Sequence, residues 1–192
     1  MLLVALVLLV PAEVATAYAG EDSQALGLGA YLTLTLVGYP WAYGAMTVTM
    51  ARAARSPLEP YGRTVDRVPA LVLLNFAAGL AVGLALLLLI VPGLLLGARW
   101  SAAGPLVALE RQGPFQALET SNGLVRGRTW RVVGAFLIVF LVAALVSIPA
   151  VFATLSETTW ISGLAAAAFD VTLFLPLTAF VYAVYRTARA GQ

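Results

Sequence analysis

Long runs of apolar residues, separated by short polar links, dominate the pattern of this chain. Five runs cover residues 1–19, 25–50, 68–91, 131–155 and 160–186. A helix that crosses the hydrocarbon core of a bilayer needs about 20 mostly apolar residues, so each of the last four runs is long enough. The first run is interrupted by Pro11 and Glu13 and is either a spanning helix or a signal peptide. We favour the helix, because a signal peptide begins with a basic region that this run lacks.

The links between the runs hold most of the arginines and so predict how the chain is oriented. Residues 51–67 contain four arginines, and the tail carries Arg186 and Arg189. Arginine-rich links close to spanning helices are retained on the cytoplasmic side. The link and the tail are therefore both predicted to be cytoplasmic.

This orientation requires one further crossing between the third and fourth long runs. The only apolar candidate is residues 93–109, which as a helix would be about 25 Å long, at the short end of what can span. The sequence thus predicts an all-α, polytopic integral membrane protein with six transmembrane helices and both termini in the cytoplasm. An alternative with five crossings keeps residues 92–131 on one face, but it places either the central arginines or those of the tail outside.

Residues 113–125, between the fourth and fifth predicted crossings, have a helical rather than a spanning pattern. Pro114 suits a first helical turn, and residues at spacings of three and four form one stripe. The stripe consists of Phe115, Leu118, Asn122 and Val125. We predict a short helix lying in the cytoplasmic interface, and the alternative is a solvated loop.

Composition agrees with the membrane assignment and restricts the chemistry. Apolar residues make up 61% and charged residues 10% of the 192 residues, whereas soluble domains have about 45–50% and about 25%. The chain lacks cysteine and histidine, which removes thiolate chemistry, the commonest general base and the commonest metal ligands. The arginines form no continuous basic face, so nucleic acid is not an expected partner. We expect no cofactor, no metal site, no catalytic residue and no enzymatic activity.

Three ionisable residues fall inside predicted crossings: Glu13, Arg99 and Asp170. Such residues are costly in lipid and need a partner or water. The six-crossing arrangement places all three in the outer half of the membrane, so we predict that Arg99 pairs with Asp170 and that Glu13 is a second partner. The cluster is either a buried ion pair that fixes the helices or part of a substrate or proton path.

Other residues within the crossings predict local features. Pro40 is expected to kink the second helix, because its ring removes a backbone donor. Gly79 and Gly83 form a GxxxG pair, which is either a helix-packing face or a chance occurrence. Asn75 and Ser101 are expected to form hydrogen bonds across helices.

The central stretch, residues 92–134, carries an ordered set of motif residues. They are Pro92, Gly93, Arg99, Trp100, Pro105, Glu110, Ala117, Leu118, Ser121, Leu124, Arg126, Gly127, Trp130 and Arg131. In this order they resemble the membrane domain attached to some bacterial glycerophosphoryl diester phosphodiesterases, and a related superfamily of multi-helix inner-membrane proteins. The resemblance implies a six-helix domain in the cell (inner) membrane. It does not imply the phosphodiesterase reaction, which in those enzymes belongs to a separate soluble barrel that uses histidine and metal-binding carboxylates.

These observations favour one membrane domain over residues 1–192 that has no enzymatic role. Membrane lipids, a second copy of the chain or another membrane protein are the expected partners. The alternative is a small transporter or channel-like protein that uses Arg99 and Asp170. Buried charges and proline-broken helices, such as those at Pro105 and Pro176, are common at transport sites.

Overall fold

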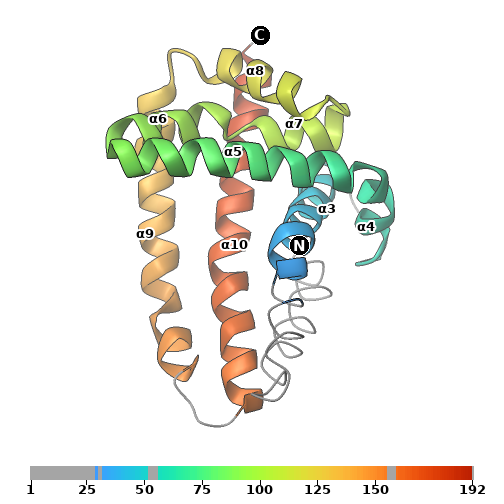
Figure 1. The fold of residues 1–192 in the computed structure, drawn as a ribbon, viewed down its shortest axis with the longest axis vertical. Coiled ribbons are helices and arrows are strands. Elements are labelled where there is room, and N and C mark those ends of the chain that lie inside the picture. The colour runs from blue at the N-terminus through green and yellow to red at the C-terminus, as the bar shows by residue number, and fades with distance from the viewer. Residues whose placement is uncertain (1–28, 30–31, 52–55, 155–158, 192) are drawn as a thin grey trace.

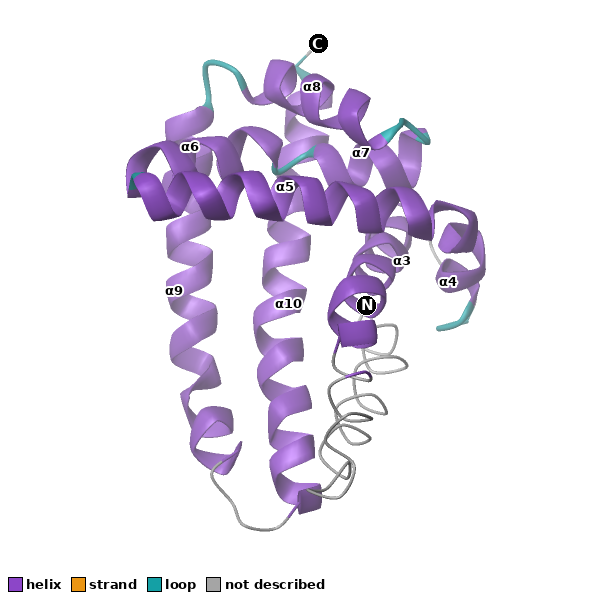
Figure 2. Ribbon diagram, in the orientation of Figure 1, coloured by secondary structure: helices purple, strands orange, loops and turns teal. Residues whose placement is uncertain are grey.

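The protein is described here from a computed structural model, which covers residue 29 and residues 32–51, 56–154 and 159–191. Every regular element in these ranges is a helix (Figure 2), so the predicted all-α class is confirmed. Four stretches in them are long and apolar enough to cross a membrane: Glu59–Leu88, Ile90–Glu110, Thr129–Pro149 and Ala165–Ala190. The predicted crossing 1–19 and Glu13 lie outside the described residues.

The second predicted crossing, residues 25–50, contains a change of helix type just before Pro40. A π-helical turn, η2 (Leu34–Gly38), runs directly into α3 (Tyr39–Ala51). Pro40 lies at the second position of α3, and a proline cannot donate the hydrogen bond that would continue a regular α-helix. A wider helical turn therefore precedes Pro40, and the kink expected there stays a prediction.

The polar link after α3 leads into a tight helical hairpin. The described part of the link contains α4 (Glu59–Thr64) and the short 3-10 helix η3 (Val65–Arg67). The hairpin consists of α5 (Val68–Leu88) and α6 (Ile90–Trp100), and the single extended residue Leu89 connects them. Gly93 lies at a close contact between the two helices, because a Cβ atom there would be 2.5 Å from Cγ of Leu86.

The predicted crossing 93–109 is not one continuous helix. The chain turns at Ser101 and Ala102 and resumes as α7 (Ala103–Glu110). The helix then ends at Arg111, whose left-handed conformation (φ 59°) lets its backbone N–H bond to the carbonyl oxygen of Leu106.

The remaining helices lie close to where the sequence predicts them. They are α8 (Pro114–Val125), α9 (Thr129–Thr154) and α10 (Thr159–Ala190). At about 1.5 Å per residue, the 26 residues of α9 extend about 39 Å and the 32 residues of α10 about 48 Å. Both are long enough to cross a bilayer despite Pro149 and Pro176 inside them.

The helices divide into two groups by direction. Figure 1 shows α9 and α10 side by side along the long axis of the molecule, while α5 and α6 cross them near one end and α8 lies beyond the crossing. That end carries Arg131 at the start of α9 and Arg186 near the end of α10, and we call it the arginine end.

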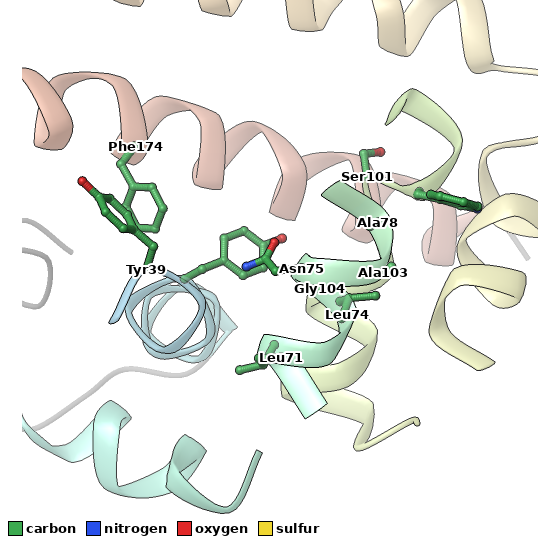
Figure 3. A pocket seen from close by; sticks show the side chains of 11 residues that line it. Tyr39, Leu71, Leu74, Asn75, Ala78, Ser101, Ala103, Gly104 and Phe174 are labelled. Atoms are coloured by element: carbon green, nitrogen blue, oxygen red, sulfur yellow. The ribbon is translucent and has the colours of Figure 1, made fainter. Parts of the chain in front are cut away.

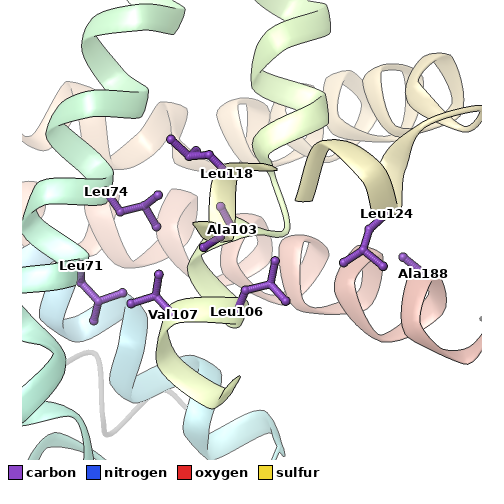
Figure 4. Packing of buried hydrophobic residues seen from close by; sticks show 9 residues of the cluster. Leu71, Leu74, Ala103, Leu106, Val107, Leu118, Leu124 and Ala188 are labelled. Atoms are coloured by element: carbon purple, nitrogen blue, oxygen red, sulfur yellow. The ribbon is translucent and has the colours of Figure 1, made fainter. Parts of the chain in front are cut away.

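The largest buried cluster lies at the arginine end, where α5, α7, α8 and α10 meet (Figure 4). Its members are Leu71, Leu74, Ala103, Leu106, Val107, Ala117, Leu118, Leu124 and Ala188. In contrast, α9 is exposed along most of its length, as at Ile138 (65%) and Phe152 (69%). An apolar helix with this much exposed surface is suited to lipid rather than to water.

Candidate functional site

A cavity of about 350 Å³ lies between α3, α5, α7 and α10, beside the junction of α6 and α7 (Figure 3). It is lined by Tyr39, Tyr43, Leu71, Leu74, Asn75, Ala78, Trp100, Ser101, Ala103, Gly104 and Phe174. The lining is mainly aliphatic and aromatic, with a few polar groups among them. Ligand sites in proteins have this composition, and their volumes start at about 300 Å³.

Close contact between α3 and α7 forms one wall of the cavity. The ring of Tyr43 lies against the backbone of Gly104, where an added Cβ would be 2.1 Å from Cε1 of the ring. Only glycine at this position leaves room for the ring. The sequence gives no direct signal for this contact, because the two residues lie on separate helices far apart in the chain.

Asn75 is a polar residue of the cavity lining. It is exposed on α5, and its amide forms no hydrogen bond with any residue of the described ranges. Figure 3 shows its amide beside the cavity, near Gly104. The predicted bond of Asn75 across helices is therefore not found in these ranges, and Ser101 bonds within its own turn, to the carbonyl oxygen of Ala98 at 2.8 Å.

Asp170 lies next to the cavity through its contact with Tyr39. The Tyr39 hydroxyl donates a hydrogen bond to the Asp170 carboxylate. The Tyr39 ring also meets the edge of Phe174, with ring centroids 5.5 Å apart at an angle of 70°, and both rings line the cavity. The half-buried carboxylate of Asp170 is thus held one helical turn away from the wall of the cavity.

The structure does not bring Arg99 to Asp170. Arg99 is exposed near the end of α6, and no ion pair within the described ranges includes it. Its neighbour Ala98 packs in the cluster that contains Phe180. Asp170 lies ten residues, about 15 Å, before Phe180 along α10. The predicted pair is therefore replaced by Tyr39 and Asp170, because α6 meets α10 only near the arginine end.

The motif residue Ser121 has a role that the sequence did not indicate. Its fully buried hydroxyl, on α8, donates a hydrogen bond to the carbonyl oxygen of Arg99 at 2.7 Å and accepts one from the backbone N–H of Ala102 at 3.1 Å. These two backbone groups flank the break between α6 and α7. Ser121 therefore fixes the break and, with it, the position of Trp100 at the cavity.

The buried face of α8 differs from the stripe that the sequence predicts. The face that packs on the protein is Ala117, Leu118, Ser121, Leu124 and Val125. Phe115 and Asn122, predicted to lie in the stripe, are exposed. The polar residue Ser121 is accommodated on this buried face because its hydroxyl bonds to backbone groups of Arg99 and Ala102.

Glu110 ties the end of α7 to the end of α10. Its carboxylate accepts hydrogen bonds from Nε of Arg189 at 2.8 Å and from the Tyr185 hydroxyl at 2.8 Å, and it forms an ion pair with the same arginine. Arg111, the next residue, forms an ion pair with Asp66 of η3. The polar contacts at the arginine end thus join three segments that are distant in sequence.

The other motif residues shape the turns of the chain. Pro92 is exposed in the first turn of α6, whereas Pro105 is fully buried in the first turn of α7. The turn between α8 and α9 includes Gly127 at φ 87°, a conformation that favours glycine. Three motif residues around that turn, Arg126, Trp130 and Arg131, are exposed.

A second, more polar cleft of about 420 Å³ lies at the arginine end, and the sequence did not predict it. It is lined by Val48, Gly62, Arg63, Asp66, Arg67, Ala108, Leu109 and Arg111. Asp66 pairs with two of its arginines. Among the described residues, no three acidic, histidine or cysteine side chains are grouped so that they could hold a metal ion.

Comparisons with known proteins identify the family of the chain but attach no activity to it. No curated protein and no solved structure matches the sequence. A family model described as a domain of unknown function, DUF7847, matches residues 27–186. This match covers most of the chain, including the cavity, the hairpin and the motif residues. The chain therefore belongs to the family of the domain of unknown function DUF7847.

Proposed function

We propose that this protein is a non-enzymatic membrane module that binds a lipid-like molecule in the cavity between α3, α5, α7 and α10. The observation that carries the proposal is the amide of Asn75, which has no partner in the described ranges, beside a mainly apolar lining. An amide in an apolar environment costs free energy unless it is hydrogen-bonded. A ligand with an apolar body and one carbonyl or hydroxyl group satisfies both parts of this site.

The size and position of the cavity support a lipid-derived ligand. A volume of about 350 Å³ admits a short apolar molecule or part of an acyl chain, rather than a complete phospholipid. Because α5 is apolar and exposed on its outer side, at Phe76 (62%) and Leu80 (55%), such a ligand reaches the cavity from the bilayer. The polar groups of the lining are hydroxyls, an indole N–H and an amide. The Ser101 hydroxyl donates its hydrogen bond to the carbonyl oxygen of Ala98 and not to a base, so it is not an activated nucleophile.

Lipid retention during purification tests this function. We expect native mass spectrometry of the purified protein to show a bound lipid-like molecule. Asn75→Leu should lower its occupancy about tenfold, since one hydrogen bond contributes about 1–1.5 kcal/mol. Ala78→Phe, which fills the cavity, should abolish binding. The matched control is Phe76→Leu, an exposed position on the same helix outside the lining. Equal retention in all four proteins would refute the proposal.

Proton-coupled transport is a second candidate, and the bond between Tyr39 and Asp170 favours it. A carboxylate within an apolar helix, hydrogen-bonded to a phenol beside a cavity, is an arrangement found along proton paths. In this case Asp170→Asn should abolish proton or solute flux into liposomes while the protein still folds. The binding function instead predicts no flux through the unchanged protein or through the Asp170→Asn protein.

We further propose that the protein lies in the cell (inner) membrane with both termini cytoplasmic. The distribution of arginines supports this orientation, because six of them lie at or beyond the ends of apolar helices on one side of the predicted topology. They are Arg111, Arg126, Arg128, Arg131, Arg186 and Arg189. The resemblance to the membrane domain of glycerophosphoryl diester phosphodiesterases stays a prediction, as does a partnership with a second copy or another membrane protein.

A further inference from the structure

The turn of the α5–α6 hairpin lacks the polar residues that a turn in water would carry. It consists of Leu87, Leu88, Leu89, Ile90 and Val91, whose exposed fractions range from 54% to 82%. No charged residue occurs between Arg67 and Arg99. A hairpin that crossed the whole membrane would present this turn to the water or headgroups on the far side, where its apolar surface is disfavoured.

Two backbone hydrogen bonds close the turn within the chain. The N–H of Leu89 donates to the carbonyl oxygen of Ala85 at 2.9 Å, and the N–H of Gly93 donates to the carbonyl oxygen of Leu89 at 3.3 Å. Leu89 is the only residue between the two helices. Backbone polar groups that lack partners cost on the order of several kcal/mol each in lipid, and these two bonds lower the number of such groups at the turn.

The reach of α6 limits how deep the turn can lie. This helix has 11 residues, about 16 Å, and its C-terminal end is bonded to Ser121 of α8. The hydrocarbon core is about 30 Å thick. If α8 lies at the interface on the arginine side, the turn reaches no further than about the middle of the bilayer even with α6 perpendicular to the membrane.

The hairpin packs on α9 and α10 only near the arginine end. Its Leu94, Leu95 and Ala98 share a cluster with Val132, Val133, Phe180 and Val184. Val132 follows Arg131 directly, and Val184 lies two residues before Arg186. Figure 1 shows the same arrangement, in which α5 and α6 cross the two long helices rather than run beside them.

We propose that the α5–α6 hairpin does not cross the membrane but inserts into the leaflet on the arginine side, with its turn among the acyl chains. The exposed side of α5 at Leu73, Phe76, Leu80 and Leu84 continues the same apolar surface. Arg99, at one end of the charge-free stretch, is exposed and in no ion pair of the described ranges, so it is available for the phosphates of that leaflet. The orientation of every other helix is unchanged, because the hairpin begins and ends on one side.

Cysteine labelling tests the position of the turn, and the chain is suited to it because it contains no cysteine. Leu88→Cys is compared in intact membrane vesicles with Gln112→Cys and Thr159→Cys, which mark the two sides. A membrane-impermeant maleimide should modify the Leu88→Cys protein at least tenfold more slowly than the accessible control from either side, and fully after SDS is added. Modification of this protein from the side on which the Thr159→Cys protein reacts would overturn the proposal.

Distances between spin labels then identify the leaflet. Nitroxides at positions 88 and 130 are compared with nitroxides at 88 and 152 in the full-length protein in lipid nanodiscs. Positions 130 and 152 are exposed and lie about 33 Å apart along α9, and this pair serves as the control for folding. The proposal requires the 88–130 distance to be the shorter one, and a shorter 88–152 distance would show that the hairpin crosses. Neither measurement depends on whether the cavity binds a ligand.

Discussion

Ser121, Asn75 and Tyr39 show how single polar atoms determine the arrangement of a chain that is otherwise nearly all hydrocarbon. Ser121 bonds two backbone groups at the break between α6 and α7, and Tyr39 bonds the carboxylate of Asp170. Asn75 has no protein partner in the described ranges and faces the cavity. In an apolar surrounding each such atom is either bonded or available for a ligand, because the alternative is an uncompensated polar group.

Replacement of Ser121 by alanine should destabilise the protein markedly. The change leaves the carbonyl oxygen of Arg99 and the N–H of Ala102 without the hydroxyl that bonds both. We expect the free energy of unfolding in mixed micelles to fall by about 1–3 kcal/mol.

The control for this change is Ser147→Ala. Ser147 is also buried, but its hydroxyl bonds only to the carbonyl oxygen of Ala143 one turn earlier in α9. That carbonyl oxygen lies within the regular helix, so loss of the hydrogen bond from the Ser147 hydroxyl should change the free energy of unfolding by less than about 0.5 kcal/mol. Equal effects of the two substitutions would mean that Ser121 does not hold the break.

Replacement of Gly104 by alanine should disturb the cavity. The new Cβ would lie 2.1 Å from Cε1 of Tyr43, so the ring has to move or α3 and α7 have to separate. We expect a loss of about 1–3 kcal/mol in the free energy of unfolding and a lower retention of the bound molecule. Gly79→Ala is the matched control, because nothing lies within 4 Å of a Cβ at Gly79. That change should leave stability unchanged or raise it by up to about 1 kcal/mol.

At the scale of helices, the apolar runs predict where helices form but not where a run breaks into two helices. The predicted runs 68–91 and 131–155 correspond closely to α5 and α9, since charged residues and prolines mark their limits in the sequence. The run 93–109 predicts one helix, and the structure has two. The Ser121 hydroxyl holds the break by accepting a hydrogen bond from the N–H of Ala102 and donating one to the carbonyl oxygen of Arg99, and no pattern within the run contains that information.

The sequence also does not predict which groups the polar side chains bond to. A count of residues from each predicted helix end places Arg99 and Asp170 at similar depth, but this assumes that every helix is upright. In the structure α6 crosses α9 and α10 near the arginine end (Figure 1). Arg99 of α6 is therefore near that end, whereas Asp170 lies farther from it along α10. Asn75 could be recognised as a polar residue in an apolar run, whereas its position beside Gly104 required the fold.

The contact between α7 and α10 allows a prediction about a pair of helices. Glu110 and Arg189 share a hydrogen bond and an ion pair, and about a third of each side chain is exposed. A double-mutant cycle with Glu110→Ala and Arg189→Ala should give a coupling free energy of about 0.5–1 kcal/mol, lowered by salt.

The matched pair for this cycle is Glu59 and Arg63, which form an ion pair one turn apart within α4. An exposed pair of this spacing contributes about 0.3–0.5 kcal/mol and holds no second helix. A coupling between Glu110 and Arg189 no larger than this would mean that the contact does not fix the end of α10.

At the scale of the whole molecule, two buried clusters and the ion pair between Glu110 and Arg189 lie at the arginine end of the described residues. A third cluster joins α3 to Val171 of α10 farther along that helix. The surface of α9 away from that end is apolar and exposed, as at Val146 (63%) and Phe152 (69%). A molecule with one densely packed, charged end and one apolar end is suited to a membrane in which the packed end meets the headgroups on one side.

This asymmetry predicts the side of the membrane on which each link lies. Reporter fusions made after Gln112 and at the C-terminus should be active only as cytoplasmic reporters, because each follows an arginine-bearing segment. A fusion after Glu157, in the link between α9 and α10, should be active only outside. An alkaline phosphatase and a green fluorescent protein fused at each position give opposite readings and serve as mutual controls. The result at Gln112 is expected whether the α5–α6 hairpin crosses or inserts into one leaflet, so an external reading there would contradict both arrangements and favour five crossings.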